Sequence, residues 1–475
     1  MKLKVIYIIA AALAVAACSR PEITWTDGPI YPDYTDVTIP VGIAPLNFYY
    51  TDSSQDVTTT FSCDGEKVVI RGRKVSWNIR KWHSFIEKAA GKDISVSSSR
   101  GDVPDWTIHV STDPIDYGVC YRLIAPGYET WSKMGIYERD LSSFKETPLI
   151  ENTQFTGCVN CHSFNKCNPE DLSMHIRGPH GCSLLRIDGE LDSYKTQTDS
   201  TLGAVAFAYW HPDGNYIAYS TNTSRQGFHE MAGKLLEVCD LAADVLVYDV
   251  RDHSLVTNKA LSGDGFWETY PAFSPDGKTL YYCSAKARHL PKDVREIWYN
   301  LCSVDFDAET GRPGSVVDTL VFAEGMQKSV CFPKPSFDGR FLMYTLNDYG
   351  TFNVWHHESE LWLLDLQTGE ARPLANANSN DAEAYHNWCS NSRWFVFASR
   401  RDNGLFTYLY LCHIDENGNE DKAFMLPQRD PVEYYTSQYR SFNIPEFVTG
   451  PVNFDRLKAE KLINSRKKTP FRYKR

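Results

Sequence analysis

The residues best suited to chemistry form the run Cys158-Val159-Asn160-Cys161-His162. A C-x-x-C-H spacing is typical of covalent haem c, because two thiols form thioether bonds to the porphyrin and the adjacent imidazole binds the iron. With 13 Cys and 13 His in 475 residues, chance would place such a run in roughly one chain in a hundred of this composition. The run therefore predicts haem bound through Cys158 and Cys161, with His162 as the proximal ligand.

The sixth position of that iron has several candidate ligands. His175, Met174 and His180 lie close along the chain, and the fold could bring in His229 or His386 from farther away. A histidine would keep the reduction potential low, whereas a methionine would raise it. Two axial ligands would imply electron transfer, and an open position would permit gas binding or peroxide chemistry.

Other uses of the same cysteines stay open. Seven Cys and His residues fall within 25 positions: Cys158, Cys161, His162, Cys167, His175, His180 and Cys182. A tetrahedral zinc site could combine the first two cysteines, one of the other two and a histidine, or Cys158 and Cys161 could form a structural disulfide with no cofactor. The adjacency of His162 to Cys161 favours haem over zinc. Cysteines in apolar runs elsewhere are expected to be buried thiols.

The N-terminus predicts export and a lipid anchor. Lys2 and Lys4 precede a 13-residue apolar stretch, residues 5–17, which is too short to span a bilayer but suits a signal peptide. The string Val15-Ala16-Ala17-Cys18 resembles a bacterial lipobox, so we expect Cys18 to be acylated with palmitate or a similar chain. The alternative is an ordinary signal peptide cleaved before Ser19. Because Ser19 is not the Asp that favours inner-membrane retention, the cell envelope at the outer membrane is expected, with the face left open.

Charge is unevenly distributed along the chain. The formal net charge of −11 becomes −13 without Lys2 and Lys4, yet residues 456–475 carry nine Lys and Arg against one acidic residue. An acidic exported body argues against nucleic acid as a partner. We expect this basic tail to be a solvated end, with contact to lipid phosphates or an acidic partner as the alternative. A composition of 42% hydrophobic and 13% aromatic residues indicates a folded chain.

A repeated turn unit predicts an all-β fold. Four copies of an aromatic or apolar residue and an Asp-Gly-like turn each precede a strand-like run: Trp210-His211-Pro212-Asp213-Gly214, Phe273-Ser274-Pro275-Asp276-Gly277, Ser336-Phe337-Asp338-Gly339 and Trp388-Cys389-Ser390-Asn391-Ser392. An Asp-Gly turn closes a hairpin, and hairpins bury their faces by radial stacking. Spacings of 63, 62 and 53 residues exceed the usual propeller repeat, so insertions are implied. We expect a β-propeller of five or six blades, with a β-sandwich as the alternative.

The remaining segments fit around that propeller. We expect a signal peptide over residues 1–17, a lipidated linker over 18–40, and a smaller β-sandwich-like domain over 41–150 with one short helix near 82–90. An irregular haem-motif segment over 151–190, rich in Gly, Asn and Pro, would lead into the propeller over 191–450. The basic tail, 451–475, would end the chain.

Several strings together resemble a known family. They are Ile43-Ala44-Pro45-Leu46-Asn47-Phe48, Tyr121-Arg122-Leu123-Ile124, the C-x-x-C-H run, His175-Ile176-Arg177-Gly178, Ser390-Asn391-Ser392-Arg393-Trp394 and Asn443-Ile444-Pro445-Glu446-Phe447. They resemble a family of Bacteroidota envelope lipoproteins with a TolB-like propeller, often labelled cytochrome c-related or cytochrome c biogenesis proteins. The resemblance implies the haem motif, the propeller and a ligand role for His175. Pro179-His180-Gly181-Cys182 departs from the glycine-rich stretch of relatives, which puts the local ligand set in doubt.

Two functions follow. The first is a lipid-anchored c-type cytochrome-like protein that transfers electrons between envelope redox partners, with the propeller as docking platform. The second is a TolB-like binding or scaffold lipoprotein whose C-x-x-C-H run is structural. The sequence has no G-x-S-x-G elbow, P-loop or H-E-x-x-H motif. Acid–base pairs at a propeller mouth could come from Glu358, Glu360, Asp381 or Glu383 beside His356, His357 or His386, so the question of an enzyme stays open.

Overall fold

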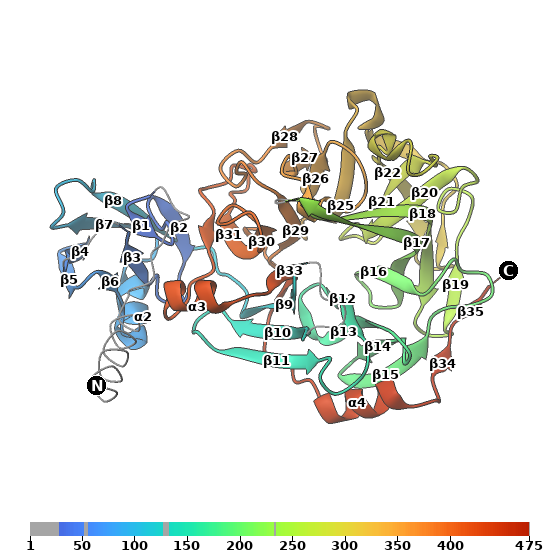
Figure 1. Ribbon diagram of the computed structural model, residues 1–475, viewed down its shortest axis with the longest axis horizontal. Helices are drawn as coiled ribbons and strands as arrows, with labels where there is room; N and C mark the ends of the chain where they lie inside the picture. Colours follow the sequence, from blue (N-terminus) through green and yellow to red (C-terminus); the bar gives the residue numbers. More distant parts are fainter. Residues whose placement is uncertain (1–27, 52–55, 127–132, 232–233, 475) are drawn as a thin grey trace, which may run out of the picture.

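The computed structural model describes residues 28–51, 56–126, 133–231 and 234–474 (Figure 1). The predicted signal peptide, the Cys18 anchor and the start of the linker lie outside these residues. Within them, no helix combines the length and the apolar character needed to cross a bilayer.

A small unit of two sheets precedes the larger body. The five-stranded sheet has the order β2 (Val37–Pro40), β8 (Trp106–Ser111), β7 (Asp93–Ser98), β4 (Thr58–Cys63) and β5 (Glu66–Arg71), and β2 runs parallel to β8. The second sheet has the order β1 (Ile30–Tyr31), β3 (Phe48–Tyr50) and β6 (Lys74–Val75). Helix α2 (Ile79–Lys88) begins at Asn78, whose side chain accepts hydrogen bonds from two backbone N–H groups. The helix buries Trp82, Phe85 and Ile86.

Six more sheets follow. The first and second contain β9 (Gly118–Ile124), β10 (Gly135–Asp140) and β11 (Glu146–Glu151) with β33 (Ser441–Val448), and then β12 (Cys158–Asn165), β13 (Asn168–Arg177), β14 (Cys182–Ile187) and β15 (Glu190–Lys195). The third and fourth contain β16 (Val205–Trp210), β17 (Tyr216–Met231), β18 (Lys234–Asp249) and β19 (Ser254–Val256), and then β20 (Phe266–Phe273), β21 (Thr279–Lys286), β22 (Asn300–Asp307), β23 (Arg312–Pro313) and β24 (Asp318–Val321). The fifth and sixth contain β25 (Ser329–Pro335), β26 (Phe341–Asn347), β27 (Glu360–Asp365) and β28 (Ala371–Pro373), and then β29 (Glu383–Trp388), β30 (Trp394–Ser399), β31 (Tyr408–His413) and β32 (Phe424–Met425).

The sheets are arranged radially around a common axis (Figure 1). Their inner strands contact one another in a closed circuit, β33 to β12, β16, β20, β25, β29 and back to β33. This is the arrangement of a β-propeller, and it leaves the sheets' outer edges short and protected. The all-β prediction is confirmed.

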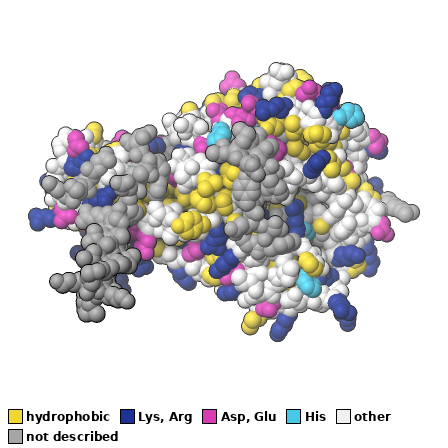
Figure 2. Space-filling model, in the orientation of Figure 1, with side chains coloured by type: hydrophobic (Ala, Val, Ile, Leu, Met, Phe, Trp, Pro, Cys, Tyr) yellow, Lys and Arg dark blue, Asp and Glu magenta, His cyan; other side chains and the backbone are white. Residues whose placement is uncertain are grey.

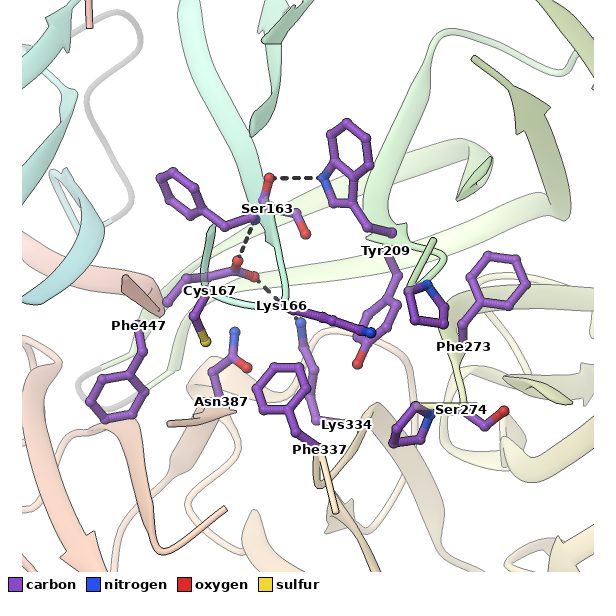
Figure 3. Close-up of a pocket in the computed structure, with 15 residues that line it drawn as sticks. Ser163, Lys166, Cys167, Tyr209, Phe273, Ser274, Lys334, Phe337, Asn387 and Phe447 are labelled. Atoms are coloured by element: carbon purple, nitrogen blue, oxygen red, sulfur yellow. Dashed lines mark hydrogen bonds and ion pairs between the residues drawn. The ribbon is translucent and has the colours of Figure 1, made fainter. Parts of the chain in front are cut away.

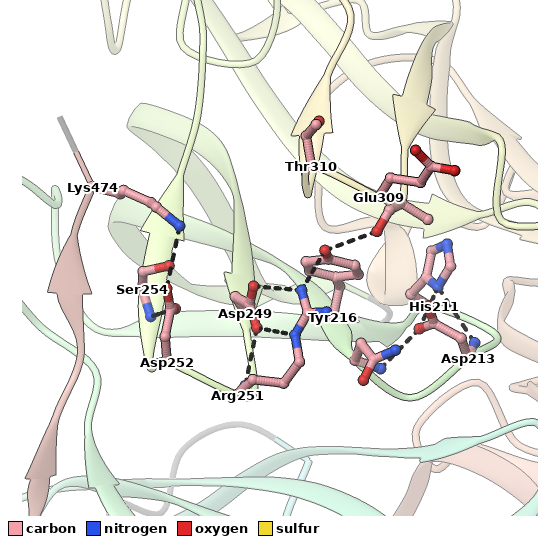
Figure 4. Close-up of polar contacts among 12 residues, drawn as sticks. His211, Asp213, Tyr216, Asp249, Arg251, Asp252, Ser254, Glu309, Thr310 and Lys474 are labelled. Carbon is pink, nitrogen blue, oxygen red and sulfur yellow. Dashed lines mark hydrogen bonds and ion pairs between the residues drawn. The ribbon is translucent and has the colours of Figure 1, made fainter.

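The predicted turns join the first and second strands of four sheets. In each turn a backbone N–H donates to the carbonyl three residues earlier, from Gly214, Gly277, Gly339 and Ser392. The three glycines have φ values of 77°, 73° and 73°, which glycine adopts without steric cost. Ser392 takes the same left-handed conformation at φ 61°. In the first of these turns, Asp213 accepts from the Asn215 N–H and lies 2.7 Å from Nδ1 of His211 (Figure 4).

Residues 151–190 differ from their prediction as an irregular segment. They hold β12, β13 and β14, which form an antiparallel sheet with β15. Their Gly, Asn and Pro residues gather at the turns between strands, which explains why composition alone suggested irregularity. The β12–β13 turn carries Lys166 and Cys167, both with positive φ, so it has no Asp-Gly signature.

The predicted domain boundary at residue 150 is also wrong. The two-sheet unit ends at Ser111, because β9, β10 and β11 belong to the ring and form a sheet with β33 from the C-terminal part of the chain. The observed unit differs from a sandwich of purely antiparallel sheets, since β2 and β8 are parallel and α2 forms part of it.

The basic tail is folded onto the ring rather than solvated. After the short helix α3 (Pro431–Ser437), helix α4 (Arg456–Asn464) packs on β14 and β15. Strand β34 (Thr469–Pro470) pairs with β15, and β35 (Arg472–Tyr473) pairs with β19. Phe471 stacks on Tyr248 with ring centroids 3.9 Å apart, and Lys474 pairs with Asp252 (Figure 4). Lys and Arg side chains line the lower edge of this body, where α4 lies (Figure 2).

A histidine joins the two-sheet unit to the ring. His413 of β31 contacts Asp113 through Nε2 at 2.7 Å and Asp421 through Nδ1 at 2.8 Å. Burial alone would lower the pKa of His413, but the hydrogen bonds to the two carboxylates outweigh it and raise the pKa. Ser111 Oγ lies 3.4 Å from the same Nε2, yet the closer Asp113 occupies that nitrogen. The arrangement is therefore a junction between units and not a Ser–His–Asp nucleophile.

We predict that this junction gives a pH-dependent stability. Because the folded protein holds the His413 proton more tightly, its contribution is full below the ordinary histidine pKa of about 6.5 and is lost as the pH rises through the folded pKa. Asp421 has a lowered pKa, so its contribution is lost on strong acidification. His413→Asn should therefore cost more near pH 5 than at pH 9, by about 1 kcal/mol or less because the carboxylates are partly exposed. Denaturant unfolding measures this difference. An equal cost at both pH values would contradict it, and His289→Asn, at an exposed position, is the control.

Candidate functional site

The axis of the ring is shaped by an irregularity that recurs in all six inner strands. Each inner strand pairs with its neighbour across a register shift that skips two residues, which is the mark of a β-bulge. In five strands the first skipped residue has positive φ, between 50° and 55°: Phe207, Tyr270, Phe332, Tyr385 and Ile444. Such conformations are costly for residues with a side chain and cluster at functional sites.

Four of these residues form an aromatic arc around the axis. Ring centroids are 4.6 Å apart for Phe207 and Tyr270, 4.4 Å for Tyr270 and Phe332, and 4.9 Å for Phe332 and Tyr385. Edge and tilted contacts of this kind are favourable. The arc separates a large cavity on one side from a small axial pocket of about 60 Å³ on the other.

The large cavity has a volume of about 380 Å³. We call it the mouth cavity. Its floor consists of Phe207, Tyr270 and Tyr385 of the arc with Cys161 and Ile444. Its walls come from the ends of β9, β12 and β13, the long β17–β18 hairpin, and the loops around Trp355 and Arg400. The exposed side chains of Arg177, Ser224 and Gln226 line it as well, so the cavity reaches the surface.

The opposite end of the axis is closed by an ion pair. A third pocket, of about 30 Å³, shares Tyr209, Lys334, Asn387 and Glu446 with the axial pocket and no residue with the mouth cavity (Figure 3). Lys334 Nζ lies 3.4 Å from Glu446 Oε1, and Glu446 Oε2 accepts a hydrogen bond from the Phe164 N–H at 2.8 Å. Burial raises the pKa of Glu446 despite this lysine. We assign the pair a structural role.

The C-x-x-C-H run lies on β12, at the edge of the mouth cavity. Cys158, half-buried, and Cys161, 7% exposed, both line the cavity. His162 pairs in register with Met174 of β13, in the space between this sheet and β9, where its ring lies 6.2 Å from that of Phe164. It also borders the small axial pocket. Cys161 borders this pocket as well, whereas Cys158 does not.

The environment of His162 is that of a core residue. The side chain is 2% exposed, and neither ring nitrogen has a hydrogen-bond partner. Burial lowers the pKa of His162 to about 3. The nearby Cys120 backbone raises this pKa, but its effect is smaller than that of burial. The imidazole is therefore neutral at ordinary pH.

The candidate sixth ligands lie apart from one another. Met174 is buried in the core beside His162, whereas the adjacent His175 faces the other side of the sheet and contacts Ser183 Oγ through Nδ1 at 3.1 Å. His180 lies in the exposed β13–β14 turn. The side chain of His229 is outside the described part of the structure. His386 borders the axial pocket, and burial lowers its pKa to about 3.

These residues do not fit a c-type haem. Thioether anchors and the proximal imidazole must reach the same porphyrin, but Cys158 lines the mouth cavity and His162 lines the axial pocket, with Cys161 at both. The axial pocket, at about 60 Å³, is far too small for a porphyrin. A zinc site fits no better, because no group of three or more His, Cys, Asp or Glu side chains among the described residues could hold a metal ion. Every described cysteine is a free thiol, so the structure contains no Cys158–Cys161 disulfide.

The acid–base candidates serve structural contacts. His357 Nδ1 lies 2.7 Å from Asp381 at the surface, and Glu383 is held by Arg401 and two serines. Burial would raise the pKa of Glu358, but its contact with His356 lowers it to about 2. None of these side chains lines the mouth cavity.

Three arginines line the mouth cavity and were missed by sequence reasoning. They are Arg122 on β9, Arg177 at the end of β13 and Arg400 after β30. No carboxylate among the described residues lies within ion-pair distance of any of them. Their positions in the sequence are 55 and 223 residues apart, so no motif spacing could have found them. Arg122 and Arg177 occur in strings that carry the family resemblance, but without a chemical signal.

Comparisons with known proteins find only distant similarity. No protein-family model matches the sequence, and no curated protein does. Among solved structures, TolB from Acinetobacter baumannii aligns at 13% identity with a TM-score of 0.42, over 74% of this chain and 78% of that one. A putative TolB from Agrobacterium tumefaciens aligns at 13% and 0.39, over 72% and 100%, and an oligogalacturonate lyase in complex with manganese at 16% and 0.37, over 64% and 78%. Similarity at this level transfers no activity.

We predict that the protein acquires no covalent haem. Purified from a host that matures c-type cytochromes, it should lack the Soret and α bands, since Cys158, Cys161 and His162 do not face a common space. Absorption spectra and haem staining after denaturation measure this directly, with a c-type cytochrome from the same host as positive control. Covalent haem in the wild type that is lost in Cys161→Ala would overturn the conclusion.

Proposed function

We propose that the chain is a binding protein, a six-bladed β-propeller that takes a small ligand in its mouth cavity. One observation carries this proposal. The mouth cavity, at about 380 Å³, lies within the size range of small-molecule sites, and it combines apolar walls with a few convergent polar groups, as such sites do. The binding role agrees with the second function expected from the sequence.

The cavity walls support a preformed site. The β17–β18 hairpin extends over the mouth and contributes Ser224, Val238 and Asp240 to the lining. It is tied down by Asp240, which accepts hydrogen bonds from Ser224 at 3.0 Å and Tyr299 at 3.2 Å. Glu237 on the same strand accepts from the Tyr349 hydroxyl at 2.9 Å. A site already ordered in the free protein loses less entropy when a ligand binds.

Electron transfer through haem is not the function that the geometry favours, because the three residues of the motif do not converge. Cys158 and Cys161 instead supply thiol surface to the ligand cavity. Partners of this protein are then the ligand and envelope proteins that deliver or receive it.

We propose, from the sequence, that the protein acts at the cell envelope on a lipid anchor at Cys18 and belongs with the envelope lipoproteins that it resembles. The support is the apolar stretch over residues 5–17 followed by Val15-Ala16-Ala17-Cys18. An exported, membrane-bound position suits a protein that binds small molecules outside the cytoplasm.

The binding function predicts that the neutral apolar probe N-phenyl-1-naphthylamine binds the mouth cavity. It should bind one per chain, and Val238→Trp should weaken binding about tenfold or more by filling the cavity. Probe fluorescence in a titration measures the affinity. Leu241→Trp is the matched control, because Leu241 lies on the same strand but is exposed at the surface. Equal affinity for the wild type and Val238→Trp would count against the cavity as the binding site.

The lipid anchor predicts that Cys18→Ser moves the protein from the membrane to the soluble fraction of the envelope. The reason is that a single thiol carries the acyl chains that hold the protein at the bilayer. Fractionation with immunoblotting measures the shift, and Ser19→Ala is the control. Retention of Cys18→Ser in the membrane fraction would refute the anchor.

A further inference from the structure

Arg400 is a buried cation with no carboxylate among the described residues within ion-pair distance, although the charge of Asp381 acts on it from farther away. Its side chain is 1% exposed, and its guanidinium lies over the Trp355 ring, with Cζ 3.1 Å from the ring centroid. Its Nε donates to the Val354 carbonyl and its Nη1 to the carbonyls of Gly404 and Leu405. These bonds hold the group in place without neutralising it. Its Nη2 donates to no described residue and is not fully buried. Because Arg400 lines the mouth cavity, this nitrogen is the one that a ligand there could contact.

Arg122 has the same property. It is 6% exposed, its Nη1 donates to Asn160 Oδ1 at 2.9 Å, and its Nε is buried without a partner. A buried charge without a partner of opposite charge destabilises the folded protein, and a buried N–H donor without an acceptor adds a further cost. Two such groups in one cavity indicate a site built for a negatively charged ligand.

The two guanidinium groups line the same cavity, together with Tyr385. Burial raises the pKa of Tyr385, and the positive charges of Arg122 and Arg400 both oppose this rise. Arg177 adds a third positive charge at the rim. Asp240 is the one acidic side chain among the described residues that line the cavity. Burial raises its pKa to about 6, and its oxygens are occupied by Ser224 and Tyr299.

We propose that the mouth cavity binds an organic carboxylate, held by the guanidinium groups of Arg122 and Arg400, with its apolar body against the aromatic arc. This inference rests on the proposed binding function and names its ligand class. Guanidinium groups match a carboxylate with two parallel hydrogen bonds. A singly charged carboxylate loses less hydration than a phosphate on entering a cavity walled by Phe207, Tyr270 and Trp355.

A matched pair of probes tests the charge. 4-Bromobenzoate and 4-bromobenzamide have nearly the same shape, and only the first is an anion. We expect calorimetric titration at constant ionic strength to show the acid binding at least about tenfold tighter than the amide. Anomalous diffraction from the bromine should place the acid in the mouth cavity, with its carboxylate toward the two arginines. Phenyl phosphate, as a third probe, should bind more weakly than the acid.

Two substitutions test the residues. Arg122→Gln and Arg400→Gln should each weaken binding of the acid about tenfold to a hundredfold and leave binding of the amide unchanged. Arg466→Gln, at an exposed position beyond α4, removes the same charge outside the cavity and is the control. Because Arg400 also holds a loop through three carbonyl groups, the folding of its variant is checked by circular dichroism. If that variant is unfolded, the Arg122 variant and the acid–amide comparison decide the question.

The outcomes separate this inference from the proposed function. If acid and amide bind the cavity equally, or if neither arginine variant weakens the acid, the carboxylate site is refuted while the binding cavity stands. If phenyl phosphate binds more tightly than the acid, the ligand class is wrong. If bromine density is found only outside the cavity, the inference falls, and the neutral naphthylamine probe then shows whether the binding function falls with it.

Discussion

The pairing of β9 with β33 is the constraint on which the rest of the structure depends. The ring of six sheets closes because β33, near the C-terminus, supplies the inner strand of the first sheet. Its residues Ser441 to Val448 pair antiparallel with Ile124 to Gly118 of β9. The mouth cavity lies across this closure, since Arg122 belongs to β9 and Asn443 and Ile444 belong to β33. The site therefore exists only in the closed ring, which couples ligand binding to the integrity of the whole propeller.

The bulges determine which side chains of the C-x-x-C-H run reach the cavities. Each bulge turns skipped residues toward the axis, and in β12 this places Cys161 on the cavity with Cys158. The next residue, His162, returns to the sheet interior. In another backbone conformation, the same spacing brings two thiols and an imidazole to one cofactor. In this strand, it places the first thiol and the imidazole apart. Residue types and spacing alone do not determine ligand geometry.

Much of the fold could be predicted from the sequence, and the misses have physical causes. The Asp-Gly turns before Tyr216, Thr279 and Phe341 were recognised because glycine at positive φ is a local requirement. The turn at Lys166 and Cys167 was missed because it reaches the same conformation without glycine. The sheet shared by β9 and β33 joins segments about 300 residues apart, and no local pattern reports such a pairing. The arginines of the cavity come from three separate sheets, so only the fold brings them together.

The separation of β9 from β33 also has a consequence for synthesis on the ribosome. β9 ends at Ile124 and its partner begins at Ser441, so one edge of β9 stays without its partner while more than 300 residues are translated. At roughly 5–20 residues per second this interval lasts tens of seconds. An unpaired strand edge recruits other strands, so the nascent chain must be kept from self-association until its last inner strand emerges.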